Sequence, residues 1–267
     1  MRRMTSSPRA WERAASWASA AKRAAAGALR LRRESIRCPV CGSRDLEVVL
    51  VGDRPCLYTC GRCRLIFRDP RPSDVELRSQ YQEDHRVPRV EEPGTYLAFR
   101  DHCYNMIKLR LREELLGEHR RALDVGCGNE VLEARGWEVE GIDPNRRQSE
   151  LLVGRGKRAA AVDLGRAVHD RWRQRRYHLV TLLHVIEHLN DPLAQVRSLG
   201  ALLAADGALV IETPLCCDLA NPDHLFFFSG TSLQILLERA GFVWDSHFLY
   251  VARGIGHDNL IVLAKPC

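Results

Sequence analysis

The chain has 267 residues, of which 45% are hydrophobic, and a formal net charge of +6. This length is enough for one α/β domain with a small additional module, and the hydrophobic fraction is enough for a packed core. No run of about 18 apolar residues is present, so no transmembrane helix is expected. Only four of the ten cysteines have paired spacing, and no signal peptide is recognised, which predicts a reducing, cytoplasmic compartment.

The positive charge is concentrated at the N-terminus. Residues 1–34 contain nine Lys and Arg side chains and two Glu, which gives +7 and leaves the remainder at −1. A nearly neutral body excludes a global nucleic-acid-binding surface. We predict that residues 1–35 form a basic Ala/Arg-rich extension that is solvated or partly disordered. An organellar transit segment and a surface-binding basic helix are the alternatives.

Two Cys-x-x-Cys pairs define a predicted module at residues 36–72. Cys38 and Cys41 are separated from Cys60 and Cys63 by 18 residues, and residues 46–51 between the pairs have the pattern of a strand. Two such pairs can direct four thiolates at one tetrahedral metal ion, and glycines at 42 and 61 are expected to permit the tight turns. The spacing predicts a zinc ribbon with structural Zn²⁺. Cys56 is expected to be a bystander, although a role as an alternative ligand stays open.

Residues 73–118 are predicted to be a helical linker or lid. A helical stretch ends near Tyr81, a polar loop follows, and apolar residues at helical spacing then extend from Tyr96 to Leu116.

Strands and helices alternate through the remaining region, residues 119–267. Strands are predicted at 121–126, 137–142, 157–162, 178–184, 208–213, 242–251 and 258–264. Asp191 and Pro192 have the pattern of a helix start, Asp206-Gly207 that of a turn, and Gly241 that of a helix end. Alternation with crossover helices predicts a mostly parallel sheet with helices on both faces. The last two strands are expected to form a hairpin that adds an antiparallel edge strand.

An apolar strand runs into the glycine turn Ala122-Leu-Asp-Val-Gly-Cys-Gly128, and a second strand ends at Gly141-Ile-Asp-Pro144. Together with Asp163 and with residues 184–189, these landmarks resemble the class I S-adenosylmethionine-dependent methyltransferases over residues 122–241. The resemblance implies a Rossmann-like, doubly wound, mostly parallel seven-stranded sheet with an antiparallel last strand, beside the small zinc ribbon. It also implies a set of cofactor-binding residues: Asp124, Gly126, Cys127, Gly128, Asp143, Pro144, Asp163, Leu164 and His184.

One position departs from the family pattern. Glu130 stands where a third glycine is usual, and the segment before Trp137 is shorter than the family's by about four residues, or one helical turn. A catalytically degenerate, cofactor-binding pseudoenzyme or scaffold is therefore an alternative to an active enzyme.

The candidates for catalysis are His184, Glu187, His188 and His224, because transfer to a hydroxyl requires removal of its proton. We expect His224 to face the substrate as a general base; alternatively, His188 caps a loop and His224 packs against phenylalanines. Some family members bind a divalent cation through a Glu-x-x-Glu-His segment and a later histidine. Here His184 replaces the first Glu, so a second divalent metal is not expected, although Glu187, His188 and His224 could supply the remaining ligands.

The predicted activity is transfer of a methyl group from S-adenosylmethionine to a small-molecule acceptor, with a hydroxyl oxygen preferred over carbon or nitrogen. A ribbon followed by Phe67-x-x-Pro-Arg-Pro72 also resembles the N-terminal module of bacterial small-molecule methyltransferases. A zinc-ribbon methyltransferase associated with nucleic acid is the alternative, and nucleic acid is not the expected partner. Cys216 and Cys217 are expected to line the pocket as free thiols, and the sequence predicts no particular oligomeric state.

Overall fold

The computed structural model describes residues 36–50, 56–83, 120–127, 132–133, 136–167, 171–215, 219, 221, 223–251 and 258–267. The predicted extension, the part of the predicted linker from residue 84 onward, and Gly128, Glu130, Cys216 and Cys217 lie outside these ranges. None of the helices in the described ranges is long and apolar enough to cross a membrane.

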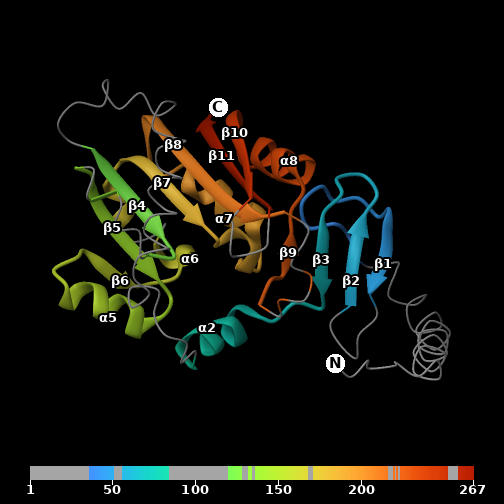
Figure 1. Cartoon of the computed structure of the whole chain (residues 1–267), viewed down its shortest axis with the longest axis horizontal. Coiled ribbons are helices and arrows are strands. Elements are labelled where there is room, and N and C mark those ends of the chain that lie inside the picture. The colour runs from blue at the N-terminus through green and yellow to red at the C-terminus, as the bar shows by residue number, and fades with distance from the viewer. Residues whose placement is uncertain are drawn as a thin grey trace, which may run out of the picture.

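The larger of two sheets has seven strands in the order β10-β11-β8-β7-β4-β5-β6 (Figure 1). These are β4 (Arg121–Val125), β5 (Glu138–Asp143), β6 (Ala159–Ala161), β7 (Tyr177–Leu183), β8 (Leu203–Pro214), β10 (Phe242–Val251) and β11 (Asp258–Pro266). Strands β4 to β8 are parallel, and β11 runs antiparallel to both β8 and β10. The predicted Rossmann-like sheet with an antiparallel last strand is confirmed. Within the terminal hairpin, β10 takes the edge and β11 lies inside the sheet.

Strand β8 begins five residues earlier than predicted. Leu203 pairs with Tyr177 and Ala208 pairs with Leu179, so the residues between Leu203 and Ala208 form an excursion within the strand. The predicted turn at 206–207 is therefore an irregularity inside β8, where a Cβ on Gly207 would lie 2.7 Å from the carbonyl oxygen of Tyr177.

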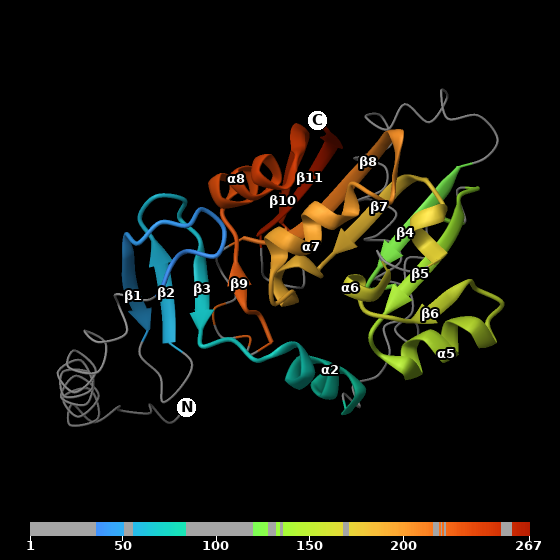
Figure 2. The same ribbon diagram turned by 180° about the vertical axis from the view of Figure 1, so that it is seen from behind.

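The helices begin and end at residues that suit those positions. They are α5 (Arg146–Gly154), α6 (Leu164–Ala167), α7 (Pro192–Leu199) and α8 (Gly230–Ala240), with 3₁₀ turns η3 (Arg171–Gln174) and η4 (Ile186–His188). Asp191 caps α7 by accepting from the main-chain N of Ala194 at 3.0 Å. Gly241 ends α8 with a φ of 89°, as the sequence predicts. Helices α7 and α8 lie together over one face of the sheet (Figure 2).

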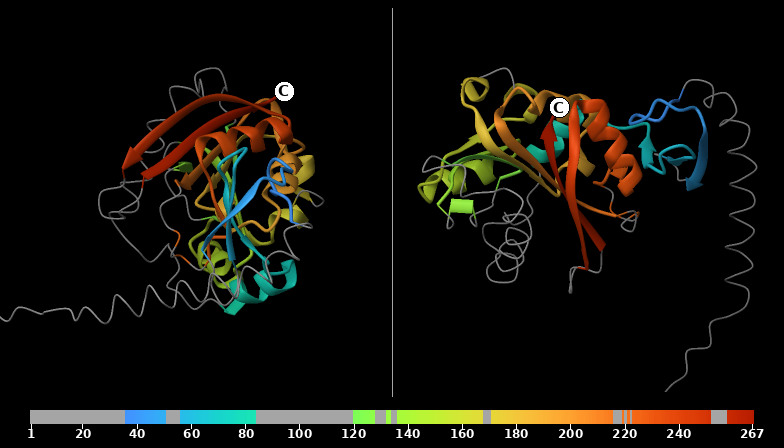
Figure 3. Two further views of the ribbon diagram at one scale, coloured as in Figure 1. Left: turned by 90° about the vertical axis from the view of Figure 1, so that its right-hand side faces the viewer. Right: turned by 90° about the horizontal axis from the view of Figure 1, so that it is seen from above.

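The second sheet joins the N-terminal module to the larger domain. Strands β1 (Leu46–Leu50), β2 (Cys56–Cys60) and β3 (Ile66–Asp69) are antiparallel, and β9 (Phe226–Phe227), from much later in the chain, pairs with β3. Figure 3 shows this sheet beside α8. Phe67 of β3 and Phe226 of β9 belong to one continuous apolar core with Leu236 of α8. The ribbon is therefore packed into the main domain and shares its core.

Helix α2 (Asp74–Glu83) follows the ribbon and crosses to the larger sheet. It begins with a capping box, because the Ser73 hydroxyl accepts from the main-chain N of Glu76 while the Glu76 carboxylate accepts from the main-chain N of Ser73. The Leu77 side chain is partly buried against the core, whereas Val75 is 68% exposed. The helix is consequently held on the domain mainly by polar contacts, which lie around the site described next.

Candidate functional site

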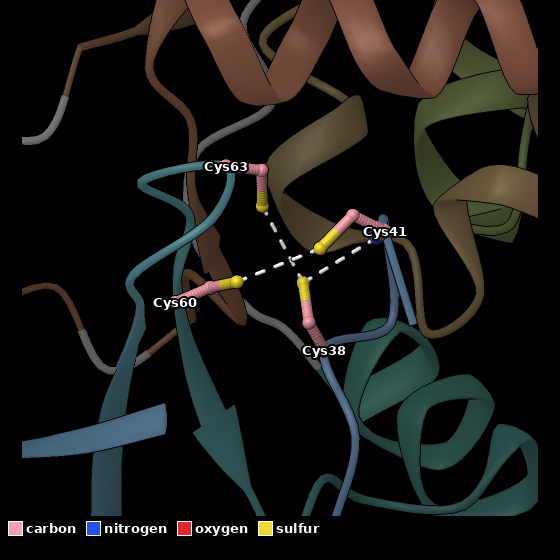
Figure 4. Close-up of side chains that lie close together, drawn as sticks. All are labelled: Cys38, Cys41, Cys60 and Cys63. Carbon is pink, nitrogen blue, oxygen red and sulfur yellow. Dashed lines mark hydrogen bonds between the residues drawn. The ribbon is translucent and has the colours of Figure 1, made fainter. Parts of the chain in front are cut away.

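The four paired cysteines meet at one point between two loops (Figure 4). The Sγ atoms of Cys38 and Cys63 lie 3.5 Å apart, and so do those of Cys41 and Cys60. Four thiolates bound to one tetrahedral Zn²⁺ at about 2.3 Å would lie slightly farther apart than this, so a small expansion would seat the ion. The donor set and its geometry fit a structural zinc site of the kind that the spacing predicts.

The two cysteine loops turn in different ways. Gly42 has a φ of 76° after the first pair, but the equivalent residue after the second pair is Arg64, with a φ of 62°. Gly61 does not have a positive φ, but a Cβ there would lie 2.1 Å from Oδ2 of the exposed Asp45 side chain, which would have to shift. The expectation that both glycines permit the turn is thus right for Gly42, whereas Gly61 allows close approach of a side chain.

A cavity of about 840 Å³ lies at the carboxyl ends of the parallel strands. Strand β4 has β5 on one side and β7 on the other, so the chain order reverses at this point, and ligands of such sheets bind outside this reversal. The lining residues that follow successive strands are Gly126 after β4, Asp143 at the end of β5, Asp163 after β6 and His184 after β7. The structure therefore brings the predicted landmarks to a single cavity.

Most of the predicted cofactor residues line this cavity: Gly126, Cys127, Asp143, Pro144, Asp163, Leu164 and His184. Asp124 lies beneath it, only 3% exposed, and accepts a hydrogen bond of 2.6 Å from the Thr181 hydroxyl. Burial, with the neighbouring carboxylates, raises the pKa of the Cys127 thiol, which is therefore neutral and unreactive.

The turn after β5 is rigidly built. The main-chain N of Asn145 donates to Oδ1 of Asp143 at 2.7 Å, and the Asn145 side chain caps α5 by accepting from the main-chain N of Gln148. The Gln148 side chain in turn donates to the Cys127 carbonyl at 3.2 Å. These bonds connect the β4 and β5 turns, so Asp143 is held in place at the cavity wall.

Helix α2 forms a wall of the cavity and contacts both of its ends. Arg78 pairs with Oδ2 of Asp163 at 3.3 Å, beside the predicted adenine position, and Gln80 donates to Oδ1 of Asp223 at 2.9 Å. The Asn145 amide also donates to the Tyr81 carbonyl at 3.0 Å. Part of the predicted linker therefore covers the pocket, whereas the predicted helix at 96–116 lies outside the described residues.

Two histidines lie edge to face at the other end of the cavity. The rings of His188 and His224 have centroids 4.9 Å apart, and His188 lines the cavity. Because a carbonyl can only accept, Nδ1 of His188 carries the proton that it donates to the Asp223 carbonyl at 2.9 Å. The Asn221 amide lies 3.1 Å from Nε2 of His224, and its oxygen accepts from the main-chain N of Asp223, so the amide donates to Nε2. Nε2 of His188 is consequently the better placed of the two to accept a proton.

His184 follows β7 in a left-handed conformation, with a φ of 55°, and its ring lies between two buried carboxylates. Nε2 is 2.9 Å from Glu212 and Nδ1 is 3.4 Å from Glu187. Burial alone would lower the pKa of His184, but these two carboxylates raise it to about 9. Burial would raise the pKa of Glu187, yet the contact with His184 holds it at about 2. Both ring nitrogens of His184 are thus engaged at neutral pH, so it is a poor proton acceptor.

Glu187, His188 and His224 each place a possible ligand atom within 4.8 Å of the others. They are the remaining members of the cation-binding set that the sequence analysis considered. The expectation that no second divalent metal binds stays a prediction.

Two residues of the site, Glu212 and Arg68, are not among those predicted from the sequence. Glu212 has no exposed surface and is the single charge in the buried run Ala208–Thr213, which is a signal that could have been followed. Arg68 lines the cavity, but its partners are main-chain carbonyls about 150 residues later in the chain, so the sequence holds no sign of its role.

A profile of a methyltransferase domain matches residues 96–247, which is more than half of the chain. Among curated proteins, a ubiquinone biosynthesis O-methyltransferase of Nitrosomonas europaea is 26% identical over 172 residues, or 58% of this chain and 72% of that protein. The corresponding protein of Bordetella avium is 30% identical over 122 residues, or 42% of this chain and 51% of that protein. This chain therefore spans about half the length of the second relative.

Solved structures share the fold at low sequence identity. A Burkholderia thailandensis 1,6-didemethyltoxoflavin-N1-methyltransferase with bound 1,6-didemethyltoxoflavin and S-adenosylhomocysteine has a TM-score of 0.54 at 19% identity, covering 82% of this chain and 99% of that one. A magnesium protoporphyrin IX methyltransferase of Synechocystis with bound S-adenosylhomocysteine has a TM-score of 0.56 at 14% identity, covering 73% and 100%. With the profile match, the sheet order and the cavity, these findings show that the chain belongs to the class I S-adenosylmethionine-dependent methyltransferases.

Proposed function

We propose that this methyltransferase acts on a hydroxyl oxygen of a small molecule. The observation that carries the proposal is that one cavity runs from Asp143 and Asp163 at one end to His188 and Asp223 at the other. Its volume of about 840 Å³ lies within the range of about 300–1,000 Å³ that is usual for small-ligand sites. The curated relatives named above are O-methyltransferases, which supports an oxygen acceptor.

The residues at the β4 and β5 ends fit an adenosyl cofactor. Gly126 leaves room at the cavity floor, where a Cβ would lie 2.5 Å from Val185, and Asp143 presents a carboxylate that can accept from two ribose hydroxyls. S-adenosylmethionine supplies an electrophilic methyl group when it is bound. Asp163 and Leu164 would lie along the adenine, as the family resemblance implies.

The acceptor side requires a group that removes the hydroxyl proton as the new bond forms. We assign this role to Nε2 of His188, because its other ring nitrogen donates to the Asp223 carbonyl and thereby fixes the tautomer. His224 packs against His188 and takes a supporting position. His184, held as a cation between Glu187 and Glu212, keeps the strand end rigid and takes no proton.

The test is methyl transfer from radiolabelled S-adenosylmethionine to a panel of catechols, simple phenols, aliphatic alcohols and primary amines. We expect transfer to a hydroxyl, and a rate about 10²–10⁴ lower in His188→Gln with unchanged affinity for S-adenosylhomocysteine. His247→Gln is the control, because this histidine is exposed on β10. Transfer to amines alone would overturn the oxygen assignment, and absence of cofactor binding at millimolar concentration would overturn the cofactor site.

A further inference from the structure

Arg68 of the ribbon strand β3 is bonded four times to one later part of the chain. Its main-chain N donates to the Leu225 carbonyl at 3.0 Å. Its side chain donates from Nε to the His224 carbonyl at 2.7 Å and from Nη2 to the Asn221 carbonyl at 2.9 Å. A longer contact of 3.3 Å joins Nη2 to the Leu219 carbonyl. One side chain thus gathers three main-chain carbonyls that come from a different module.

The guanidinium group suits this task and an ammonium group does not. Its donors lie in one rigid plane, so separate carbonyls can be held at fixed angles, whereas the lysine ammonium is a compact point charge. The group also lies 5.8 Å from the ring centre of Phe227 on β9, which is paired with β3. The guanidinium group therefore packs on Phe227 of the sheet while its donors bind the carbonyls of Asn221 and His224.

The segment that Arg68 binds, which includes Asn221, His224 and Leu225, positions both imidazoles of the acceptor side. His224 belongs to it, and its own carbonyl accepts the shortest of the Arg68 bonds. His188 is oriented by the carbonyl of Asp223, the residue between two of those that Arg68 binds. The main-chain N of Leu225 also donates to the Glu187 carbonyl at 2.9 Å, which ties the segment to the turn that carries His188.

We propose that Arg68 is a positioning residue, which holds the main chain at Asn221 and His224 so that the imidazoles of His188 and His224 stay in place beside the cavity. The catalytic importance of those imidazoles rests on the proposed function, but their placement does not. The ribbon thereby builds part of the acceptor wall through this one side chain.

The test compares Arg68→Met, which keeps an apolar stem, with Arg68→Lys, which keeps the charge, and with Arg44→Met on an exposed ribbon residue. Nitrogen-15 spectra of the histidine side chains report the tautomer of His188. In the unmodified protein we expect the form protonated at Nδ1. In Arg68→Met we expect a mixture of tautomers and amide exchange at His224 and Leu225 that is faster by about tenfold or more, since several hydrogen bonds are lost. Arg68→Lys should recover only part of both signals, and Arg44→Met should change neither.

Affinity for S-adenosylhomocysteine and zinc content are measured in the same samples. Both should stay within about twofold of the unmodified protein in every variant that folds, because Arg68 acts on the acceptor side. If Arg68→Met fails to fold, Arg68→Lys decides. An unchanged His188 tautomer and unchanged amide exchange in the folded Arg68 variant would overturn the proposal. Failure of the unmodified protein to bind S-adenosylhomocysteine would refute the proposed function instead, and the histidine spectra would still test Arg68.

Discussion

His184 and Glu212 are joined twice, through their main chains and through their side chains. The main-chain N of His184 donates to the Glu212 carbonyl at 2.9 Å, and the imidazole Nε2 lies 2.9 Å from Oε1 of the same residue. The double link holds the end of β7 against β8 at the place where His184 adopts its left-handed conformation. A partly buried imidazolium and a buried carboxylate are thus kept together at the cavity edge.

The contacts of His184 with Glu187 and Glu212 make stability depend on pH. The pKa of His184 is raised from its ordinary value of 6.5 to about 9, so the stabilisation is fully present below pH 6.5 and is lost as the pH rises to 9. The loss is on the order of 3 kcal/mol in the free energy of unfolding. In Glu212→Gln the hydrogen-bond acceptor remains but the charge is gone, so the loss should be smaller and should occur at lower pH. Urea unfolding between pH 6 and 9.5 measures both proteins.

Titration of His184 by nitrogen-15 spectra provides the direct check, and His247→Gln removes an exposed imidazole as the control. A free-energy difference between the unmodified protein and Glu212→Gln that stays constant across this pH range would show that Glu212 does not hold the charge on His184.

Substitution of Gly126 should lower the stability of the protein. Its φ is 73°, and a Cβ would lie 2.5 Å from Cγ2 of Val185, so alanine there is both strained and crowded. We expect Gly126→Ala to lower the free energy of unfolding by about 2–4 kcal/mol. Gly136→Ala is the matched control, because Gly136 has a φ of 83° with no atom within 4 Å and should show the strain alone.

Val185→Ala in the Gly126→Ala background should recover the steric part of the loss but not the strain. Equal losses in Gly126→Ala and Gly136→Ala, measured by urea unfolding, would mean that Val185 moves aside freely and that the cavity floor is soft.

Most of the fold could be predicted from local sequence patterns. The Asp191 cap and the Gly241 helix end depend on residues near in sequence, and the structure has both. A strand also lies at each of the seven predicted places in the larger sheet, although β8 begins five residues earlier. The place of β9 could not be predicted, because a two-residue strand has no periodicity of its own and is defined by pairing with β3. The same holds for the order of the last hairpin, since either strand could have paired with β8 on the basis of its pattern.

The site likewise has residues that could be predicted from the sequence and residues that could not. Asp143 and Asp163 could be placed because the chain resembles a family with acids at these strand ends, and the carboxyl ends of parallel strands meet at one sheet edge. The engagement of His184 by Glu212 could not be placed, because it depends on which strand lies beside β7. The choice between His188 and His224 as the base likewise needed the hydrogen-bond partners of each ring, which only the folded loop defines.

Two cysteines of one strand should differ in their effect on zinc binding. Cys60 and Cys56 stand at the two ends of β2, but only Cys60 belongs to the four-thiol cluster. We expect about one zinc per chain in the unmodified protein and in Cys56→Ser, and much less in Cys60→Ser. Because the ribbon shares its core with α8, Cys60→Ser should also lower the thermal midpoint of the whole protein. Elemental analysis with thermal unfolding measures both.

If zinc were retained in Cys60→Ser and lost in Cys56→Ser, the fourth ligand would be Cys56 and not Cys60. Two zinc ions per chain would point to Glu187, His188 and His224 as a second site, against the expectation from the sequence.

Asp143 and Asp163 should differ in their contribution to cofactor affinity. Asp143 accepts from the main-chain N of Asn145 through Oδ1, and its carboxylate can form charge-assisted bonds to a ribose. Asp143→Asn should therefore weaken binding of S-adenosylhomocysteine by about 10- to 150-fold. Asp163 pairs with Arg78 at 3.3 Å and accepts from the main-chain N of Arg166 at 3.0 Å, so its carboxylate is already neutralised in part.

We accordingly expect a smaller loss, below about tenfold, in Asp163→Asn. Calorimetric titration of both variants is compared with Asp206→Asn, an exposed acid in the β8 excursion that should bind like the unmodified protein. Equal losses of affinity in Asp143→Asn and Asp163→Asn would show that Arg78 leaves Asp163 when the ligand binds. An unchanged affinity in Asp143→Asn would show that the ribose does not bind at Asp143.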